Sequence, residues 1–306
     1  MDIRDIFPDA ILADAPRFRA GYASFFDPAS GRYIHIPEKS LTDRERKLLS
    51  AFLTPADAAE KNRLNSTPEQ ERWHRYLLGG GPLPDGEERR IRFLHFFIQQ
   101  PIKQQEFIDA LQSFLQEGMV VVWLDENNGI IVERESAEPV AEEEWQSFIE
   151  AIQSDFYFDV YFYRGRFFPA DEGLKDRFRR EQAYFHTALK KIQNERLFNF
   201  ERAFPVFLLL SDEETARNFL AEEWQELFSG DYELLSMIKL FIENNSNISS
   251  TAKMLYLHRN SLQYRIDKFI ERTSVDIKTF HGSVSVYFIC LFGEIVRKGD
   301  GFPLGG

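Results

Sequence analysis

Residues 247–276 read NISSTAKMLYLHRNSLQYRIDKFIERTSVD, and this segment determines the architecture of the C-terminal region. Asn247 suits the N-cap of a short helix, because its side-chain oxygen can accept a backbone N–H of the first turn. A longer helix is expected from Arg259, after a tight turn at Leu257 and His258. The order of short helix, turn and longer helix predicts a helix-turn-helix.

Apolar residues at helical spacing can hold these two helices together. A small residue is needed where the first helix touches the second, and Ala252 stands at that position. At 100° per residue, Leu262, Ile266 and Phe269 fall in one narrow sector, which is therefore the buried face of the second helix. The residues expected to join the pair are Leu255, Leu257, Leu262 and Ile266.

Tyr256 occupies the turn position at which glycine is usually preferred. A non-glycine residue in the left-handed conformation costs about 1–2 kcal/mol. We therefore expect either a different turn geometry or compensating packing of the tyrosine ring.

The opposite face of the second helix carries residue types that read DNA. Arginine can bind guanine with two hydrogen bonds, asparagine and glutamine can do the same with adenine, and hydroxyl and ammonium groups can hold phosphates. We assign base contacts to Arg259, Asn260 and Gln263. Phosphate contacts or flanking support are assigned to Ser249, Ser261, Tyr264, Arg265 and Lys268, while His258 either stabilises the turn or contacts a phosphate.

Residues 89–210 alternate between strand and helix patterns. Aromatic and β-branched runs predict strands within 91–100 and 155–167, and a hairpin over 119–135 with its turn at 125–129. Apolar residues at helical spacing predict helices within 103–118 and 141–154, and a long helix at 171–197. The order β-α-β-β-α-β is that of a ferredoxin-like split βαβ sheet. Residues 211–231 are interpreted as a polar stretch leading into the C-terminal module.

A linker separates an N-terminal module from these regions. Residues 79–86 contain three consecutive glycines and two prolines, which interrupt regular structure. Within residues 1–80 we expect two short strands joined by a turn at 27–31, followed by a helix from Ser40. This is a small α+β module, for which a sensory role and a packing role both stay open.

Composition excludes several classes of function. The 306 residues carry a net charge of -12 and the sequence pI is about 5.1, which excludes a generally basic nucleic-acid coat and argues against an anionic-membrane partner. The single cysteine, Cys290, cannot form a disulfide framework or a cysteine-rich zinc site, and we expect a buried thiol in a reducing cytoplasm. The longest apolar run, 284–292, is far short of the roughly 20 residues that span a bilayer.

Charge is unevenly distributed along the chain. Residues 231–298 contain nine basic and seven acidic residues, a net charge of +2, so the remaining 238 residues carry -14. DNA should therefore contact only the C-terminal module. Because backbone charge supplies most non-specific affinity, +2 is small for a single DNA reader, and two copies in a homodimer would compensate.

The C-terminal segment resembles the helix-turn-helix of the PucR and CdaR transcriptional regulators, whose pattern is TA-x-x-L-x-x-HRNTL-x-YR followed by T-G-x-D. The matching residues are Thr251, Ala252, Leu255, the run His258 to Leu262, Tyr264 and Arg265. Ser261 replaces the usual threonine and keeps the hydroxyl, whereas Ser274 replaces the usual glycine. The resemblance extends over residues 231–298.

Residues 89–210 resemble the GGDEF-like middle domain of the same regulators. In active diguanylate cyclases of that fold, the hairpin turn carries Gly-Gly-acidic-Glu-Phe, which binds nucleotide and metal. Here the turn is DENNG at 125–129, so the paired glycines and the carboxylate pair needed by Mg²⁺ are missing. Cyclase activity is not expected, and Asp125 and Glu126 are interpreted as turn residues.

The sequence thus predicts an α+β multidomain protein: a small module at 1–80, a degenerate GGDEF-like sheet domain at 89–210 and an all-α helix-turn-helix domain at 229–298. No P-loop, nucleophile elbow or metal-ligand spacing stands in the sequence, and we expect neither cofactor nor catalysis. The resemblance implies a cytoplasmic, sequence-specific regulator that binds double-stranded DNA as a homodimer and responds to a small-molecule effector. The alternatives are a protein-interaction or ligand-sensing module whose helix-turn-helix no longer binds DNA, and an enzyme descended from a cyclase.

Overall fold

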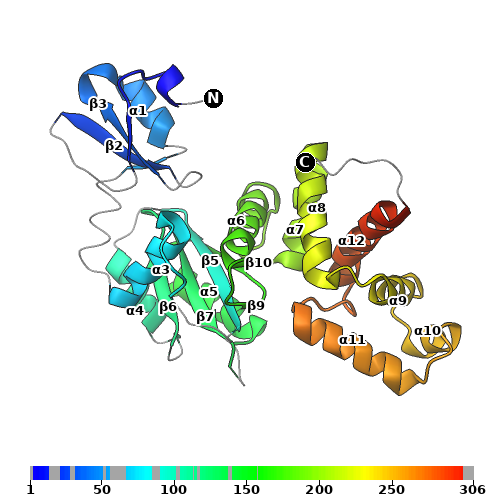
Figure 1. Cartoon of the computed structure of the whole chain (residues 1–306). Helices are drawn as coiled ribbons and strands as arrows, with labels where there is room; N and C mark the ends of the chain where they lie inside the picture. The colour runs from blue at the N-terminus through cyan, green and yellow to red at the C-terminus, as the bar shows by residue number, and fades with distance from the viewer. Residues whose placement is uncertain are drawn as a thin grey trace. The chain divides into compact units, whose positions relative to one another are not determined.

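The computed structural model of the chain divides into two compact units, drawn in Figure 1. One consists of residues 1–90, 94–160 and 169–175, and the other of residues 91–93, 161–168 and 176–306. The described residues are 3–13, 21–27, 32–50, 53–55, 67–84, 90–100, 104–112, 114–115, 118–136, 140–156 and 158–298.

The N-terminal part of the first unit is a small antiparallel sheet with one helix. Its strands are β1 (Ile11–Ala13), β2 (Tyr22–Asp27), β3 (Arg32–Pro37) and β4 (Thr54–Pro55), in the order β1-β3-β2-β4. Phe25, Ile34 and Ile36 are buried in its own apolar cluster. The predicted strand pair is present, and residues 28–31 of its predicted turn lie outside the described residues.

The expected helix of this module begins three residues later than predicted. Helix α1 (Asp43–Ser50) follows a capping box: the Thr42 backbone N–H donates to Glu45 Oε2 at 2.8 Å, and the Glu45 N–H donates to Thr42 Oγ1 at 3.3 Å. These reciprocal hydrogen bonds satisfy two N–H groups that a helix start otherwise leaves unpaired. The cap is therefore Thr42 and not Ser40.

The middle region has the predicted order of elements. These are β5 (Arg90–Ile98), α4 (Gln104–Gln112), β6 (Val120–Trp123), β7 (Asn128–Arg134), α5 (Glu142–Phe156) and β8 (Val160–Arg164). The described strands form a sheet in the order β10-β8-β5-β7-β6, with β9 beside β5. Without β9 and β10, this is the strand order of a split βαβ fold, so the predicted fold class is confirmed.

The hairpin turn is shorter than predicted. Asn128 and Gly129 belong to β7, and Trp123 pairs with Gly129 across the hairpin. A Cβ atom at Gly129 would lie 2.2 Å from the ring of Phe96. Glycine is therefore needed here for close packing in the sheet and not for the turn.

Helix α3 (Pro68–Gly79) precedes the glycine-rich segment and packs against the hairpin. Gln70 Nε2 donates to the carbonyl oxygen of Val121 at 2.8 Å, and Glu69 pairs with Arg134 at 2.6 Å. Trp73 is fully buried. Gly80 has a φ of 71° and ends helix α3 in the left-handed conformation. The helix that it ends packs against strand β6.

The second unit contains several elements that the sequence did not predict. Strand β10 (Leu197–Asn199) pairs in parallel with β8. The polar stretch at 211–231, for which the sequence predicted no helix or strand, is mostly helix α8 (Glu213–Phe228). The Asp212 side chain caps this helix by accepting the Thr215 N–H at 2.9 Å. The chain also forms β9 (Phe168–Pro169) and α7 (Phe200–Leu210), and the long helix predicted at 171–197 is α6 (Leu174–Lys191).

The C-terminal helices complete the second unit. They are α9 (Tyr232–Glu243), α10 (Ile248–Met254), α11 (Arg259–Thr273) and α12 (Phe280–Lys298), and α12 packs against α7, α8 and α9. Cys290 is fully buried on α12, and this burial raises the pKa of its thiol well above the usual value. The predicted assignment of Cys290 as a core thiol is confirmed.

Candidate nucleic-acid interface

The predicted helix-turn-helix consists of α10 and α11. Asn247 Oδ1 accepts the Ser250 N–H at 2.9 Å and caps α10, as the sequence indicated. His258 Nδ1 accepts the Asn260 N–H at 3.3 Å and caps α11. His258 therefore stabilises the turn, which was one of its two predicted roles.

Packing between the two helices follows the predicted apolar positions. Ala252, Leu262, Ile266 and Phe269 are buried, whereas Leu255 and Leu257 are only half-buried. Sequence reasoning missed Thr251, which is fully buried and accepts a hydrogen bond from Asn244 Nδ2 at 3.1 Å. Its hydroxyl thus ties α10 to the end of α9.

Tyr256 adopts the left-handed conformation, with a φ of 54°. The Leu257 N–H donates to the Ala252 carbonyl at 2.9 Å and the Tyr256 N–H to the Lys253 carbonyl at 3.2 Å, the pattern of a Schellman helix end. The side chain is 97% exposed. Both expectations for this residue were wrong, because the geometry is left-handed and the ring is not packed. Ser274, at the end of α11, is left-handed too, with a φ of 55°.

The predicted contact residues lie on the accessible surface of α10 and α11. Eight of the nine are exposed, and Gln263 is half-buried. Among the described residues, six of these side chains make no hydrogen bond or ion pair within the chain: Ser249, Arg259, Asn260, Ser261, Tyr264 and Lys268. Their polar groups are therefore free to bind a partner.

Two carboxylates bind the other two predicted contact residues of α11, Gln263 and Arg265. Asp267 Oδ1 accepts from Gln263 Nε2 at 2.8 Å and from Lys278 Nζ at 2.7 Å, and these hydrogen bonds lower the pKa of Asp267. Glu233 on α9 pairs with Arg265 at 3.4 Å. Sequence reasoning missed both acids, although the i,i+4 spacing of Gln263 and Asp267 could have indicated the first contact.

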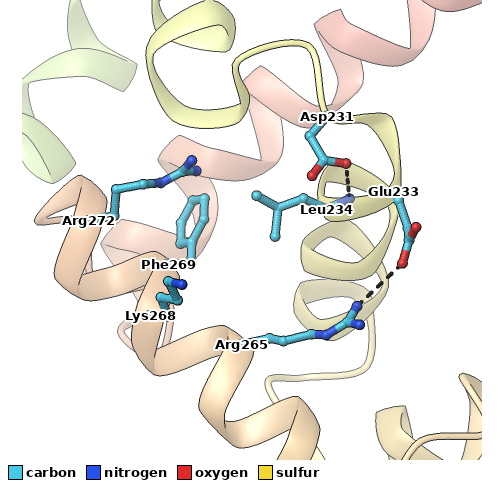
Figure 2. A pocket seen from close by; sticks show the side chains of 7 residues that line it. All are labelled: Asp231, Glu233, Leu234, Arg265, Lys268, Phe269 and Arg272. Atoms are coloured by element: carbon cyan, nitrogen blue, oxygen red, sulfur yellow. Dashed lines mark hydrogen bonds and ion pairs between the residues drawn. The ribbon is translucent and has the colours of Figure 1, made fainter.

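A groove lies between the start of α9 and α11, as Figure 2 shows. Its volume is about 340 Å³. The lining residues are Asp231, Glu233 and Leu234 from α9 and its cap, and Arg265, Lys268, Phe269 and Arg272 from α11. Arg265 is paired with Glu233, and Arg272 donates to the Leu227 carbonyl oxygen. Of the groove's three cationic side chains, Lys268 is the one that makes no such contact with a described residue.

A different polar cluster of the same unit is buried. Glu223 on α8 accepts from Arg166 at 2.6 Å, from Arg180 at 3.1 Å and from the Tyr184 hydroxyl at 2.9 Å. Burial alone would raise the pKa of Glu223. The charges of the two arginines and these hydrogen bonds outweigh that effect, so the pKa of Glu223 lies below its ordinary value. Because its carboxylate is enclosed and paired, the cluster offers no open site, and removing one partner would leave buried charge uncompensated.

The Asp125 carboxylate in the hairpin turn is engaged by the turn itself. Asp125 Oδ1 accepts the backbone N–H groups of Asn127 and Asn128 at 2.8 and 2.7 Å, and both Asp125 oxygens accept from Asn128 Nδ2. The carboxylate therefore holds the turn, as its interpretation as a turn residue required. Within the part of the chain that the structure describes, no group of three or more His, Cys, Asp or Glu side chains could hold a metal ion. No helix among those residues is long and apolar enough to cross a bilayer.

Known proteins are similar to this C-terminal domain or to most of the chain. The family model of the PucR C-terminal helix-turn-helix domain matches residues 234–292. The uncharacterised protein YxkF of Bacillus subtilis is 44% identical over 290 residues, which cover 94% of this chain and 97% of YxkF. The chain belongs to the PucR family. It is a transcriptional regulator.

Two further proteins are similar in sequence to this PucR-family regulator, one over the C-terminal domain and one over most of the chain. The purine catabolism regulatory protein of Bacillus subtilis is 41% identical over 59 residues, which are 19% of this chain and 10% of that protein. The leucine-rich protein of Streptococcus dysgalactiae subsp. equisimilis is 21% identical over 293 residues, covering 95% of the PucR-family chain and 99% of its own length.

Proposed function

We propose that this PucR-family regulator binds double-stranded DNA sequence-specifically by inserting the N-terminal half of α11 into the major groove. The observation that carries the proposal is the division of α11 into two faces. Leu262, Ile266 and Phe269 are buried, while the exposed side presents polar groups that have no partner within the described chain. In helix-turn-helix proteins, the N-terminal residues of the second helix contact base edges.

The position of each side chain suggests its role. Arg259 and Asn260 are the first two residues of α11, and their types suit guanine and adenine, respectively. Gln263 follows one turn later and is the third residue proposed to read a base. The phosphate contacts are proposed for Ser249, Ser261, Tyr264, Arg265 and Lys268. His258 uses Nδ1 for the helix cap and contributes mainly by fixing the turn.

The charge along α11 favours its N-terminal half as the end that approaches DNA. Residues 259–265 carry two arginines and no acidic residue. Residues 266–273 balance two acidic residues, Asp267 and Glu271, against Lys268 and Arg272. Phosphates are therefore attracted to the first half and much less to the second.

We further propose that the regulator acts as a homodimer in the cytoplasm, without catalysis. Two helix-turn-helix domains double the net charge of +2, and a dimer reads two half-sites about 34–36 Å apart or a multiple of that spacing. The remaining residues carry -14 and are repelled by phosphates. We propose that they bind the small-molecule effector and do not contact the operator.

Selection of bound sequences from a randomised duplex library, followed by fluorescence anisotropy on the selected duplex, tests the proposal. Each base-reading side chain contributes about 1–3 kcal/mol, so the double variant R259A/N260A should bind at least tenfold more weakly. The control is R179A, which removes one charge from an exposed arginine on α6 that pairs with Asp176. It should leave the affinity unchanged.

Two results would overturn the proposal. One is the absence of salt-sensitive binding to any duplex, and the other is equal affinity of R259A/N260A and the wild type. Co-purification with a protein partner in the absence of DNA binding would favour the alternative, in which the helix-turn-helix serves protein interaction.

A further inference from the structure

Gln263 is the one proposed base-reading residue whose side chain is held within the chain. Its Nε2 donates to Asp267 Oδ1 at 2.8 Å, one helical turn further along α11. The same oxygen accepts from Lys278 Nζ at 2.7 Å. Lys278 lies between α11 and α12, and its backbone N–H donates to Asp276 at 2.9 Å. The side chain of Asp267 is thus held from outside the helix that carries it.

This contact fixes which end of the Gln263 amide faces away from Asp267. An ionised carboxylate only accepts hydrogen bonds, so it selects the NH₂ group of the amide and repels the carbonyl oxygen. The hydrogen bonds from Lys278 and Gln263 lower the pKa of Asp267, so the carboxylate is ionised at neutral pH. One N–H and the Oε1 of Gln263 remain available to a partner.

Reading adenine requires that same pair of groups. A glutamine reads adenine by accepting from N6 and donating to N7. With one hydrogen of Nε2 bound to Asp267, the second hydrogen and Oε1 can serve these two atoms. A freely rotating amide would lose conformational freedom on binding and could present its groups in either order.

We propose that Asp267 is a positioning residue that sets the base preference of Gln263 for adenine, with Lys278 holding Asp267 in place. The inference rests on the proposed function, in which Gln263 contacts a base. Asp267 itself does not contact DNA in this arrangement.

A carboxylate near DNA has a second effect, which must be separated from the first. Asp267 repels phosphates, and its removal strengthens binding to every sequence. Glu271 carries the same charge one turn beyond Asp267 on the same helix and is also exposed. The substitution E271Q removes the same charge from the same helix without touching Gln263 or Asp267, and it serves as the charge-matched control.

The experiment is selection from a randomised duplex library with the full chain, comparing the wild type with D267N, E271Q, Q263A and the double variant Q263A/D267N. D267N and E271Q should both bind an arbitrary duplex about twofold more tightly. Only D267N should lower the preference for adenine at one base pair of the half-site, from about tenfold to about threefold or less. Q263A should abolish that preference, and adding D267N to Q263A should change it no further. The side chain of Asp267 is 51% exposed, so D267N should keep the fold, as circular dichroism can confirm.

The outcomes separate the inference from the function on which it rests. If the wild type selects a sequence and D267N selects the same bases with the same preference, the positioning role of Asp267 is wrong while the proposed function stands. If the wild type enriches no sequence, sequence-specific binding fails, and the inference fails with it.

Discussion

The polar cluster around Glu223 and the polar face of α11 belong to the same unit but differ in burial and pairing. Glu223 is fully buried and bound by two arginines and a tyrosine. Arg259 and Asn260 are exposed, and their side chains bind nothing within the described chain. Polar groups that the fold has already paired have no capacity left for a ligand, whereas unpaired polar groups on the surface are available to one. The first cluster is therefore structural, and the second is the surface that we propose for DNA recognition.

The largest expected effect is on stability, from removal of the buried carboxylate. Glu223→Ala leaves Arg166 and Arg180 buried without their shared partner, which should destabilise the protein by about 3–5 kcal/mol. Urea denaturation followed by circular dichroism measures this loss. Glu213→Ala removes an exposed carboxylate from the same helix and should cost less than about 0.5 kcal/mol. A loss below about 1 kcal/mol for Glu223→Ala would contradict the structural role of the cluster.

Acid should weaken the buried cluster in a pH range that depends on Tyr184. The pKa of Glu223 is lowered in the folded protein, so its contribution is fully present above the ordinary value of 4.5 and is lost as the pH falls through the lower, folded pKa. Tyr184→Phe removes one hydrogen bond to the carboxylate and should raise the folded pKa of Glu223 towards its ordinary value. The loss of stability in acid should then be smaller and should be complete at a higher pH. Urea midpoints of both proteins between pH 7 and pH 3 test the shift. Coincident profiles would show that the hydroxyl does not stabilise the ionised carboxylate.

A smaller effect of opposite sign is expected at the turn of the recognition surface. Tyr256 is left-handed, and its ring is 97% exposed, so no packing is lost when the side chain is removed. Tyr256→Gly should therefore stabilise the protein by about 1 kcal/mol. The matched control is Tyr264→Gly, which lies in the interior of α11 and should destabilise by a similar amount, about 1 kcal/mol. Destabilisation by Tyr256→Gly in urea denaturation would show that the ring contributes to the fold.

The smallest effect should appear in salt dependence. Lys268 is proposed to contact a phosphate and not a base, so Lys268→Ala should weaken binding equally for all sequences and reduce the slope of log affinity against log salt by about 1. Anisotropy at several salt concentrations measures this slope. Lys239→Ala removes a lysine that pairs with Glu243 and Glu294, and it should leave the slope unchanged. If Lys268→Ala changed the base preference, Lys268 would contact a base and the proposed phosphate contact would be wrong.

Local signals in the sequence predicted the helix-turn-helix well. Three features depend only on neighbours within one or two helical turns. They are the cap at Asn247, the start of α11 at Arg259 and the buried apolar face of α11. The order β-α-β-β-α-β was also predictable, since each element has its own apolar period. The assignment of individual DNA contacts stays a prediction.

Other features depend on residues far apart in the sequence and could not be predicted from it. Helix α8 has apolar residues at helical spacing, among them Phe219, Leu220 and Leu227, but its buried carboxylate could not be recognised from the sequence. The arginine partners of Glu223 lie 43 and 57 residues away. Strand β10 has three residues and pairs with β8, too short a pattern to recognise. The contact between Lys278 and Asp267 requires the chain to turn back after α11.

The sequence by itself therefore determined the helix-turn-helix, its caps and the polarity of its faces, since helical periodicity and capping act over a few residues. Only the tertiary structure decided which polar side chains are already paired. Pairing depends on distances between groups that the fold brings together, and these distances separate Glu223, which is enclosed, from Asn260, which is open to a partner.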